Sequence, residues 1–413
     1  MKAKLKKLWE GKKIGPFFIV WTIFAFYLYQ IHFKETVNDI NGTMMAFSYK
    51  YGFISRGLIG SIYQLVDAIF PVNMLSYESL VGFTTVITWI YFVILFWFFF
   101  TALKRCKFET NEEIKYLIIF FSIWAVPMFV SKYNFGRLDI YCFAFSLIAA
   151  VLLMKGKAEW LVVPLSALGV MVHQGNVFMF LNIILVLLVY KALSNEGKLR
   201  KKYLILFFLS GFVASVLFLY FEFFSHMNGE NIFEEVVAYA TAVCKNGKYH
   251  VDVVDKEILG IDLSDREVEF RWRNLVQFPI FIIFMLPYIY ITIRFFKNII
   301  RKAATKLDKF KYLFVSIGAA TIIPDLLLKC DFGRWMFAII AYYMVVTIAL
   351  IAMGDEIVEG EMKHLFKTIN EKIPCAIILL IYPILFQPLS DVSICALVSD
   401  IANQLNEAFF HLW

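Results

Sequence analysis

The sequence predicts an all-α, polytopic integral membrane protein, and three observations lead to this fold class. Of its 413 residues, 61% are hydrophobic, whereas soluble domains contain about 45–50% apolar residues. Several stretches of about 17 or more residues carry no charge, which is enough for a helix to cross a hydrocarbon core of about 30 Å. Most lysines stand at the ends of these stretches, as in cytoplasmic loops. This placement accounts for the net charge of +7 without nucleic acid as a partner.

Hydropathy predicts about eleven transmembrane helices in a single membrane domain, 1–413, with a cytoplasmic N-terminus. The first follows a lysine-rich start and is too long and too aromatic for a cleaved signal peptide. The predicted spans are 16–33, 81–103, 115–131, 138–154, 158–172, 175–191, 203–223, 277–294, 311–328, 335–353 and 373–388. Loops 34–80 and 224–276 are then extracytoplasmic, and the tail 391–413 has the apolar face of an amphipathic helix at the outer membrane interface.

The segment 158–189 decides the orientation of everything that follows it. A single helix of this length would reach about 48 Å, which is too long for the bilayer. We therefore predict a break at "HQGN", residues His173–Asn176. With this break, 27 of the lysines and arginines fall on the cytoplasmic side and 13 outside, as the positive-inside rule favours. Without this break, the excess of lysines and arginines on the cytoplasmic side disappears.

The distinctive polar residues gather at the predicted outer ends of the spans. Two turns share the form Phe-Gly-Arg, "NFGRLD" and "DFGRW", and the third turn is "HQGN". Charges at membrane depth are expensive, so they are normally paired or line a polar cavity. These outer residues are Asp39, Lys50, Arg56, Arg137, Asp139, His173, Lys329, Asp331 and Arg334.

Arginines at such turns suit a pyrophosphate or another polyanion. The guanidinium stays charged and bonds phosphate oxygens in pairs. For each arginine taken singly, two alternatives remain open: contact with lipid headgroups, or pairing with an aspartate such as Asp139 or Asp331. A lone His173 is more often a packing histidine than a catalyst. The case for a site is the convergence of these residues on one side of the membrane.

The cysteines and the acidic residues predict neither a metal site nor a cofactor. The six cysteines show no metal-ligand spacing, and the outer loops contain no Asp-x-Asp motif. A disulfide between Cys244 and Cys395 is open but unsupported.

The stretch from "NFGRLD" to "HQGNVFMFL" resembles the bacterial O-antigen, capsular and exopolysaccharide polymerases, the Wzy-like family. It has an arginine at a helix start, a short basic turn between two spans, and a histidine on the same side as the arginine. The resemblance covers about 45 residues, and the rest of the chain only by topology.

This resemblance implies a membrane glycosyltransferase of the bacterial cytoplasmic membrane, compatible with a GT-C-like helical bundle. Its substrate would be undecaprenyl-diphosphate-linked oligosaccharide, and a flippase and a chain-length regulator would be partners. Arg137 would hold the donor diphosphate, His173 would orient or deprotonate the acceptor hydroxyl, and Asp139 completes the predicted catalytic set. The predicted substrate contacts are Arg56, Lys50, Asp39, Lys329, Asp331, Arg334, Arg271 and Arg273.

Two rival functions remain. One is a different polyprenyl-phosphate-sugar-dependent transferase with a catalytic acid in the first outer loop, where Asp39 stands. The other is a transporter or flippase for lipid-linked oligosaccharide. Transporters usually show broken helices at mid-membrane and repeated halves, whereas here the polar residues gather at one surface.

Overall fold

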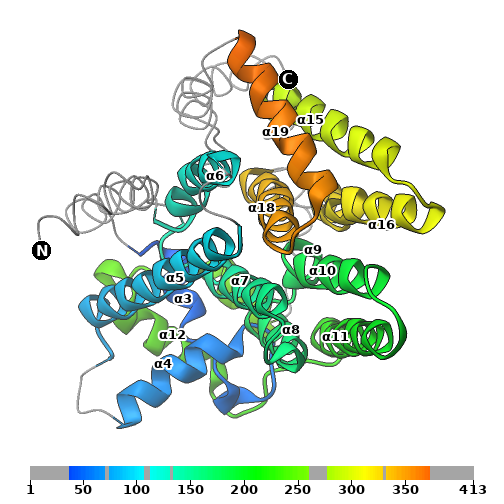
Figure 1. Ribbon diagram of the computed structural model, residues 1–413. Helices are drawn as coiled ribbons and strands as arrows, with labels where there is room; N and C mark the ends of the chain where they lie inside the picture. The colour runs from blue at the N-terminus through cyan, green and yellow to red at the C-terminus, as the bar shows by residue number, and fades with distance from the viewer. Residues whose placement is uncertain are drawn as a thin grey trace, which may run out of the picture.

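The computed structural model describes residues 37–69, 74–106, 112–130, 134–259, 277–328 and 332–372. Within these ranges the regular secondary structure is entirely helical (Figure 1). The longer helices are α4 (Gly57–Ile69), α5 (Tyr77–Arg105), α6 (Glu112–Val130), α7 (Asp139–Lys155), α8 (Val162–Val172), α10 (Leu181–Leu193), α11 (Gly197–Phe223), α12 (Ile232–Val243), α13 (Val251–Leu259), α15 (Gln277–Lys302), α16 (Lys306–Ile317), α18 (Phe332–Ala352) and α19 (Glu356–Lys372). The short elements are α3 (Asp39–Met44), η1 (Tyr49–Tyr51), η2 (Glu159–Leu161), α9 (Asn176–Met179), η3 (Lys245–Gly247), η4 (Gly318–Ile322) and α17 (Ile323–Leu328).

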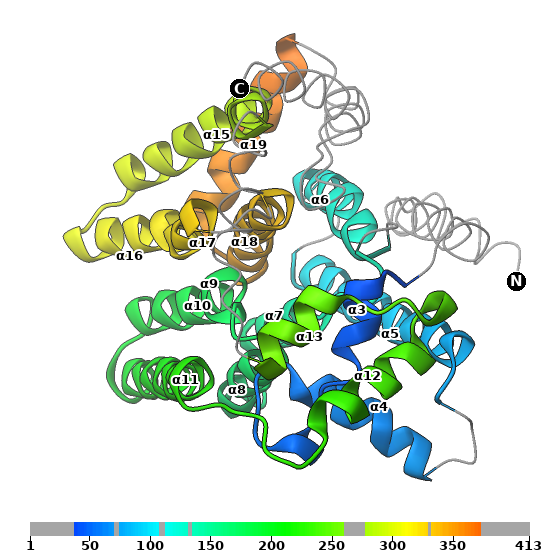
Figure 2. The same ribbon diagram turned by 180° about the vertical axis from the view of Figure 1, so that it is seen from behind.

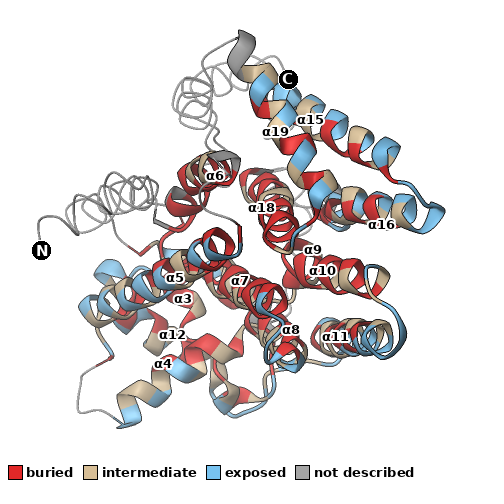
Figure 3. Ribbon diagram, viewed as in Figure 1, coloured by how far each residue is buried: buried red, intermediate tan, exposed pale blue. Residues whose placement is uncertain are grey.

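Helices α7, α10 and α18 form the centre of the bundle. They pack on one another and on α5, α6, α8 and α11, and their ribbons are mostly buried (Figure 3). The core is built from large apolar side chains, such as Phe143 of α7 and Phe337 of α18, whose rings lie 5.7 Å apart.

Among the described residues, three helices are long and apolar enough to cross a membrane, judged by length and composition: Tyr77–Arg105, Gly197–Phe223 and Gly333–Ala352. Only 22% of the apolar window of α11 is buried inside the protein. Its exposed face carries Phe208 and Phe212, at 66% and 68% exposure. A helix that is apolar on its exposed face is suited to lipid rather than to water.

Each predicted span within the described residues coincides with a helix or with consecutive short helices. The spans at 16–33 and 373–388 and the tail helix at 391–413 lie outside those residues. Some of the matching helices are short: α8 has 11 residues, or about 17 Å at 1.5 Å per residue. Eleven crossings therefore remain a proposal.

The predicted break at "HQGN" is confirmed. Helix α8 ends at Val172, His173 is extended with φ −155° and ψ 118°, and α9 begins at Asn176. Cys142 of α7 donates to the Gly169 carbonyl of α8 at 3.4 Å, so α8 runs back along α7. His173 thereby returns to the end of the bundle where α7 begins.

The bundle has two chemically different ends. One contains the start of α7, the end of α8, the end of α11 and the start of α18; we call it the arginine end, after Arg137 and Arg334. The opposite end we call the lysine end, because Lys191 and Lys202 bind Glu159 there and Lys302 binds Glu361 at 2.5 Å. Lys202, Lys302 and Glu361 belong to connections that were predicted to be cytoplasmic.

The lysine end also holds a helix that hydropathy did not indicate. Helix α19 packs on α15, α18 and α6 in the connection after the predicted span 335–353. Asp355 caps its start by accepting the backbone N–H groups of Ile357 and Val358 at 3.1 and 3.0 Å. The other Asp355 oxygen accepts the hydroxyls of Tyr190 and Tyr312, which ties α19 to α10 and α16.

The two loops predicted to be extracytoplasmic fold against each other. Residues 37–69 and 224–259 form a small helical layer, the outer module, which contains α3, α4, α12 and α13 (Figure 2). The Asn228 amide donates to the Tyr51 carbonyl at 2.8 Å, and the His250 amide donates to Thr43 Oγ1 at 2.9 Å. Cys244 is buried here, and burial raises the pKa of its thiol to about 11; Cys395 lies outside the described residues.

Helix α4 reaches its position in the outer module only because Gly60 has no side chain. A Cβ atom there would lie 1.9 Å from the Phe47 carbonyl oxygen and 2.8 Å from that of Met45. We expect Gly60→Ala to detach α4 and to lower the thermal unfolding temperature in detergent. The matched control is Gly82→Ala in α5, where nothing lies within 4 Å. Equal stability of both variants would contradict this packing.

Candidate functional site at the arginine end

A buried ion pair joins the two Phe-Gly-Arg sequences; the first forms a turn before α7, whereas Phe332–Arg334 is the helical start of α18 rather than the predicted turn. Arg334, in the first turn of α18, donates from Nε to Asp139 Oδ2 at 2.7 Å and from Nη2 to Asp139 Oδ1 at 2.9 Å. The Asp139 side chain is 1% exposed and that of Arg334 11%. Such a bidentate pair fixes both the distance and the plane of its partners. It therefore locks the start of α7 to the start of α18.

Arg137 stands two residues before Asp139 and is buried, with 7% exposure. Its backbone closes a tight turn: its amide donates to the Asn134 carbonyl at 3.1 Å, and its carbonyl accepts from the Ile140 amide at 3.3 Å. Gly136 supplies the left-handed conformation that the turn needs, with φ +89°. Asn41 of the outer module clamps this turn by donating to the Phe135 carbonyl at 3.0 Å.

His173 is the third sequence-distant residue at this end. Arg334, His173 and Arg137 all lie close enough to the Asp139 carboxylate to act on it electrostatically. The imidazole is half-buried, and its Nδ1 accepts the Gly175 backbone N–H at 2.9 Å. The structure thus brings Arg137, Asp139, His173 and Arg334 to one end of the bundle, and their roles stay a prediction.

Gln174 connects the "HQGN" turn to two other segments. Its side-chain carbonyl accepts the Ser55 hydroxyl of the outer module, and its amide donates to the Glu222 carboxylate, at the end of α11, at 3.1 Å. Arg56 follows Ser55 directly and has φ +63°, a left-handed conformation that non-glycine residues rarely adopt. The hydrogen bond from Ser55 to Gln174 therefore holds the neighbouring residue Arg56 close to the "HQGN" turn.

Other predicted site residues have different surroundings or lie outside the described part. Lys50 binds Glu235 of α12 at 2.7 Å, and that carboxylate raises the pKa of Lys50. The Asp39 side chain is exposed in the first turn of α3. The predicted residues outside the described ranges are Lys329, Asp331, Arg271 and Arg273.

Sequence reasoning missed three members of this site: Ser55, Gln174 and Glu222. Glu222 offered a signal, because it is the one charged residue inside the predicted span 203–223 and stands at its outer end. Gln174 lies within the "HQGN" turn but was not assigned a role. Their connection depends on segments 119 and 48 residues apart.

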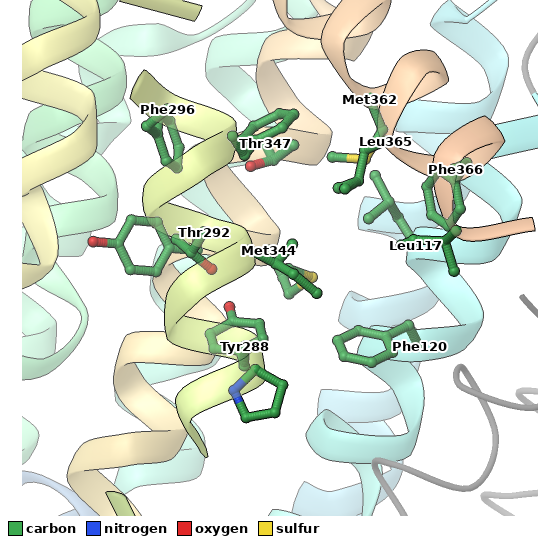
Figure 4. A pocket seen from close by; sticks show the side chains of 15 residues that line it. Leu117, Phe120, Tyr288, Thr292, Phe296, Met344, Thr347, Met362, Leu365 and Phe366 are labelled. Atoms are coloured by element: carbon green, nitrogen blue, oxygen red, sulfur yellow. The ribbon is translucent and has the colours of Figure 1, made fainter. Parts of the chain in front are cut away.

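Among the described residues, no group of three or more His, Cys, Asp or Glu side chains could hold a metal ion. An apolar cavity of about 140 Å³ lies between α6, α15, α18 and α19 (Figure 4). Its polar lining groups are only the hydroxyls of Tyr288, Thr292, Tyr343 and Thr347. It provides space but no charged group.

Comparison with known proteins assigns no family to this chain. No family model, no curated protein and no solved structure matches the chain.

Proposed function

We propose that this protein is a polysaccharide polymerase-type glycosyltransferase that joins polyprenyl-diphosphate-linked oligosaccharide units on the outer face of a bacterial cytoplasmic membrane. The observation that carries the proposal is the meeting of three sequence-distant turns at one end of the bundle. Two cations, Arg137 and Arg334, meet His173 there around one buried carboxylate, Asp139. The proposal includes eleven spans and a cytoplasmic N-terminus, with a flippase and a chain-length regulator as partners.

Arg137 and Arg56 are the cations we assign to the donor diphosphate. In the reaction, the acceptor hydroxyl oxygen forms a bond to the anomeric carbon while the bond from that carbon to the diphosphate oxygen breaks. The electron pair leaves with the diphosphate, and fixed cations stabilise the negative charge that develops there. The hydroxyl proton needs a base, for which the described site offers the His173 imidazole and the Glu222 carboxylate.

Asp139 and Arg334 have a positioning role in this proposal. Both Asp139 oxygens accept from Arg334, so the carboxylate is engaged and its charge is balanced. We therefore assign the pair to holding Arg137 at a fixed place between α7 and α18.

Two separate variants, His173→Ala and Asp39→Ala, distinguish this function from the rival transferase with a catalytic acid in the first outer loop. We expect His173→Ala to abolish long polymer in cells, with single lipid-linked units accumulating, because the bound units are no longer joined. Asp39→Ala removes at most one exposed substrate contact, so it should still form long polymer. Loss of polymer in Asp39→Ala alone would overturn the assignment in favour of the rival.

A further inference from the structure

A groove of about 390 Å³ lies between α15 and α16. These two helices pack on each other and stand at one edge of the bundle in both views (Figures 1 and 2). The inner wall of the groove includes Phe296 of α15 and Tyr343 of α18, whose rings lie 5.5 Å apart. The Tyr343 hydroxyl donates to the Ser316 carbonyl at 2.8 Å, so this wall also joins α18 to α16.

The groove is apolar at one end and basic at the other. Ile293 and Ile317 line its apolar part and are 63% and 53% exposed. Lys297 and Arg301 line it about one and two turns further along α15, next to Lys302 of the lysine end. Eight residues of helix separate Ile293 from Arg301, a rise of about 12 Å. The groove thus changes from apolar to cationic towards the lysine end, which is the order of the chains and the headgroup in a phospholipid.

Lys297 and Arg301 are available to bind an anion. They stand four residues apart, on the same face of α15, and both are exposed. Among the described residues, no carboxylate forms an ion pair with either of them: Glu361 of α19 is bound by Lys302, and Asp308 of α16 by another lysine. Two cations therefore remain at the edge of an apolar groove.

We propose that this groove binds an anionic phospholipid. Lys297 and Arg301 hold the phosphate through charge-assisted hydrogen bonds, and an acyl chain lies on the apolar side chains of α15 and α16. Basic pockets between membrane helices at the cytoplasmic side are suited to anionic lipid headgroups, and in the proposed orientation the lysine end faces the cytoplasm. The inference does not depend on the transferase activity.

The unfolding temperature of the purified native protein in a neutral detergent tests this inference. Added phosphatidylglycerol should raise it by at least about 3 °C, since a ligand that binds only the folded state stabilises that state. Phosphatidylcholine has the same chains without the net charge, and inorganic phosphate has the charge without a chain. Each should raise the unfolding temperature by less than about 1 °C. A rise with either one equal to that with phosphatidylglycerol would overturn the proposal.

Two double variants separate this site from general attraction to a basic surface. Lys297→Gln with Arg301→Gln should abolish the effect of phosphatidylglycerol and, because both residues are exposed, should unfold like the native chain when no lipid is added. The matched control, Lys198→Gln with Lys201→Gln, removes the same two charges from exposed positions at the start of α11, outside the groove. It should keep the full effect. An effect that survives in the first variant, or is lost equally in both, would overturn the proposal.

A photoreactive phosphatidylglycerol locates the site without any substitution. With the reactive group on the acyl chain and the native protein in phosphatidylcholine vesicles, crosslinked peptides should concentrate in residues 292–317, which contain the α15 and α16 lining of the groove. Photoreactive phosphatidylcholine should not show this preference. If the groove variant does not fold, this measurement decides, and labelling by the two lipids with the same distribution would overturn the proposal.

Discussion

Replacing Arg334 with alanine should lower the free energy of unfolding by about 3–5 kcal/mol, because it removes the bidentate hydrogen-bonding partner of a buried carboxylate. The Asp139 side chain is 1% exposed and gives both oxygens to this arginine. Unfolding in mixed detergent micelles measures the change. Asp139→Ala should also lower the free energy of unfolding, because it removes the acceptor of two Arg334 hydrogen bonds.

The exposed pair of the outer module serves as the matched control. Lys50 and Glu235 form an ion pair of the same length, 2.7 Å, but their side chains are 63% and 44% exposed. Exposed pairs contribute little because water and salt screen them. Lys50→Ala should therefore leave the unfolding transition unchanged. A double variant, Asp139→Asn with Arg334→Gln, should regain part of the loss; a double variant less stable than both single ones would contradict the pairing.

Replacing Arg137 with alanine should reduce polymer formation by about 10²–10³-fold, the size expected when one fixed donor to a developing oxyanion is removed. The side chain is buried beside the Asp139–Arg334 pair, so no other residue is expected to replace it. The rate at which lipid-linked units lengthen in reconstituted vesicles measures the effect.

Arg137→Lys keeps the charge but loses the planar fork of donors. We expect it to recover only a minor part of the activity, with a fold stability like that of the native chain. Activity of Arg137→Ala within a few-fold of the native level, in a variant that folds normally, would remove this arginine from the donor site.

Much of the bundle could be predicted from the sequence, for a physical reason. Charge-free stretches long enough to cross a bilayer mark helices, and a run as long as 158–189 has to break. The polar "HQGN" turn stands near the middle of this run, and α8 ends there. Helix α19 was not predicted because its pattern is amphipathic rather than continuously apolar.

The site was predictable as a set of residues but not as a set of bonds. Sequence spacing drew attention to Asp331, within one helical turn of Arg334, and Asp331 lies outside the described residues. The bond to Asp139 spans 195 residues and follows from α7 and α18 packing side by side. The Ser55–Gln174–Glu222 connection was hidden for the same reason, since the outer module forms only when two distant loops meet.

The most direct test of the central claim uses the purified native protein in lipid vesicles supplied with polyprenyl-diphosphate-linked repeat units. We predict a ladder of longer lipid-linked glycans, with one free polyprenyl diphosphate released for each bond formed. Units that stay single, or that appear intact on the other side of the bilayer, would contradict the assignment as a polymerase.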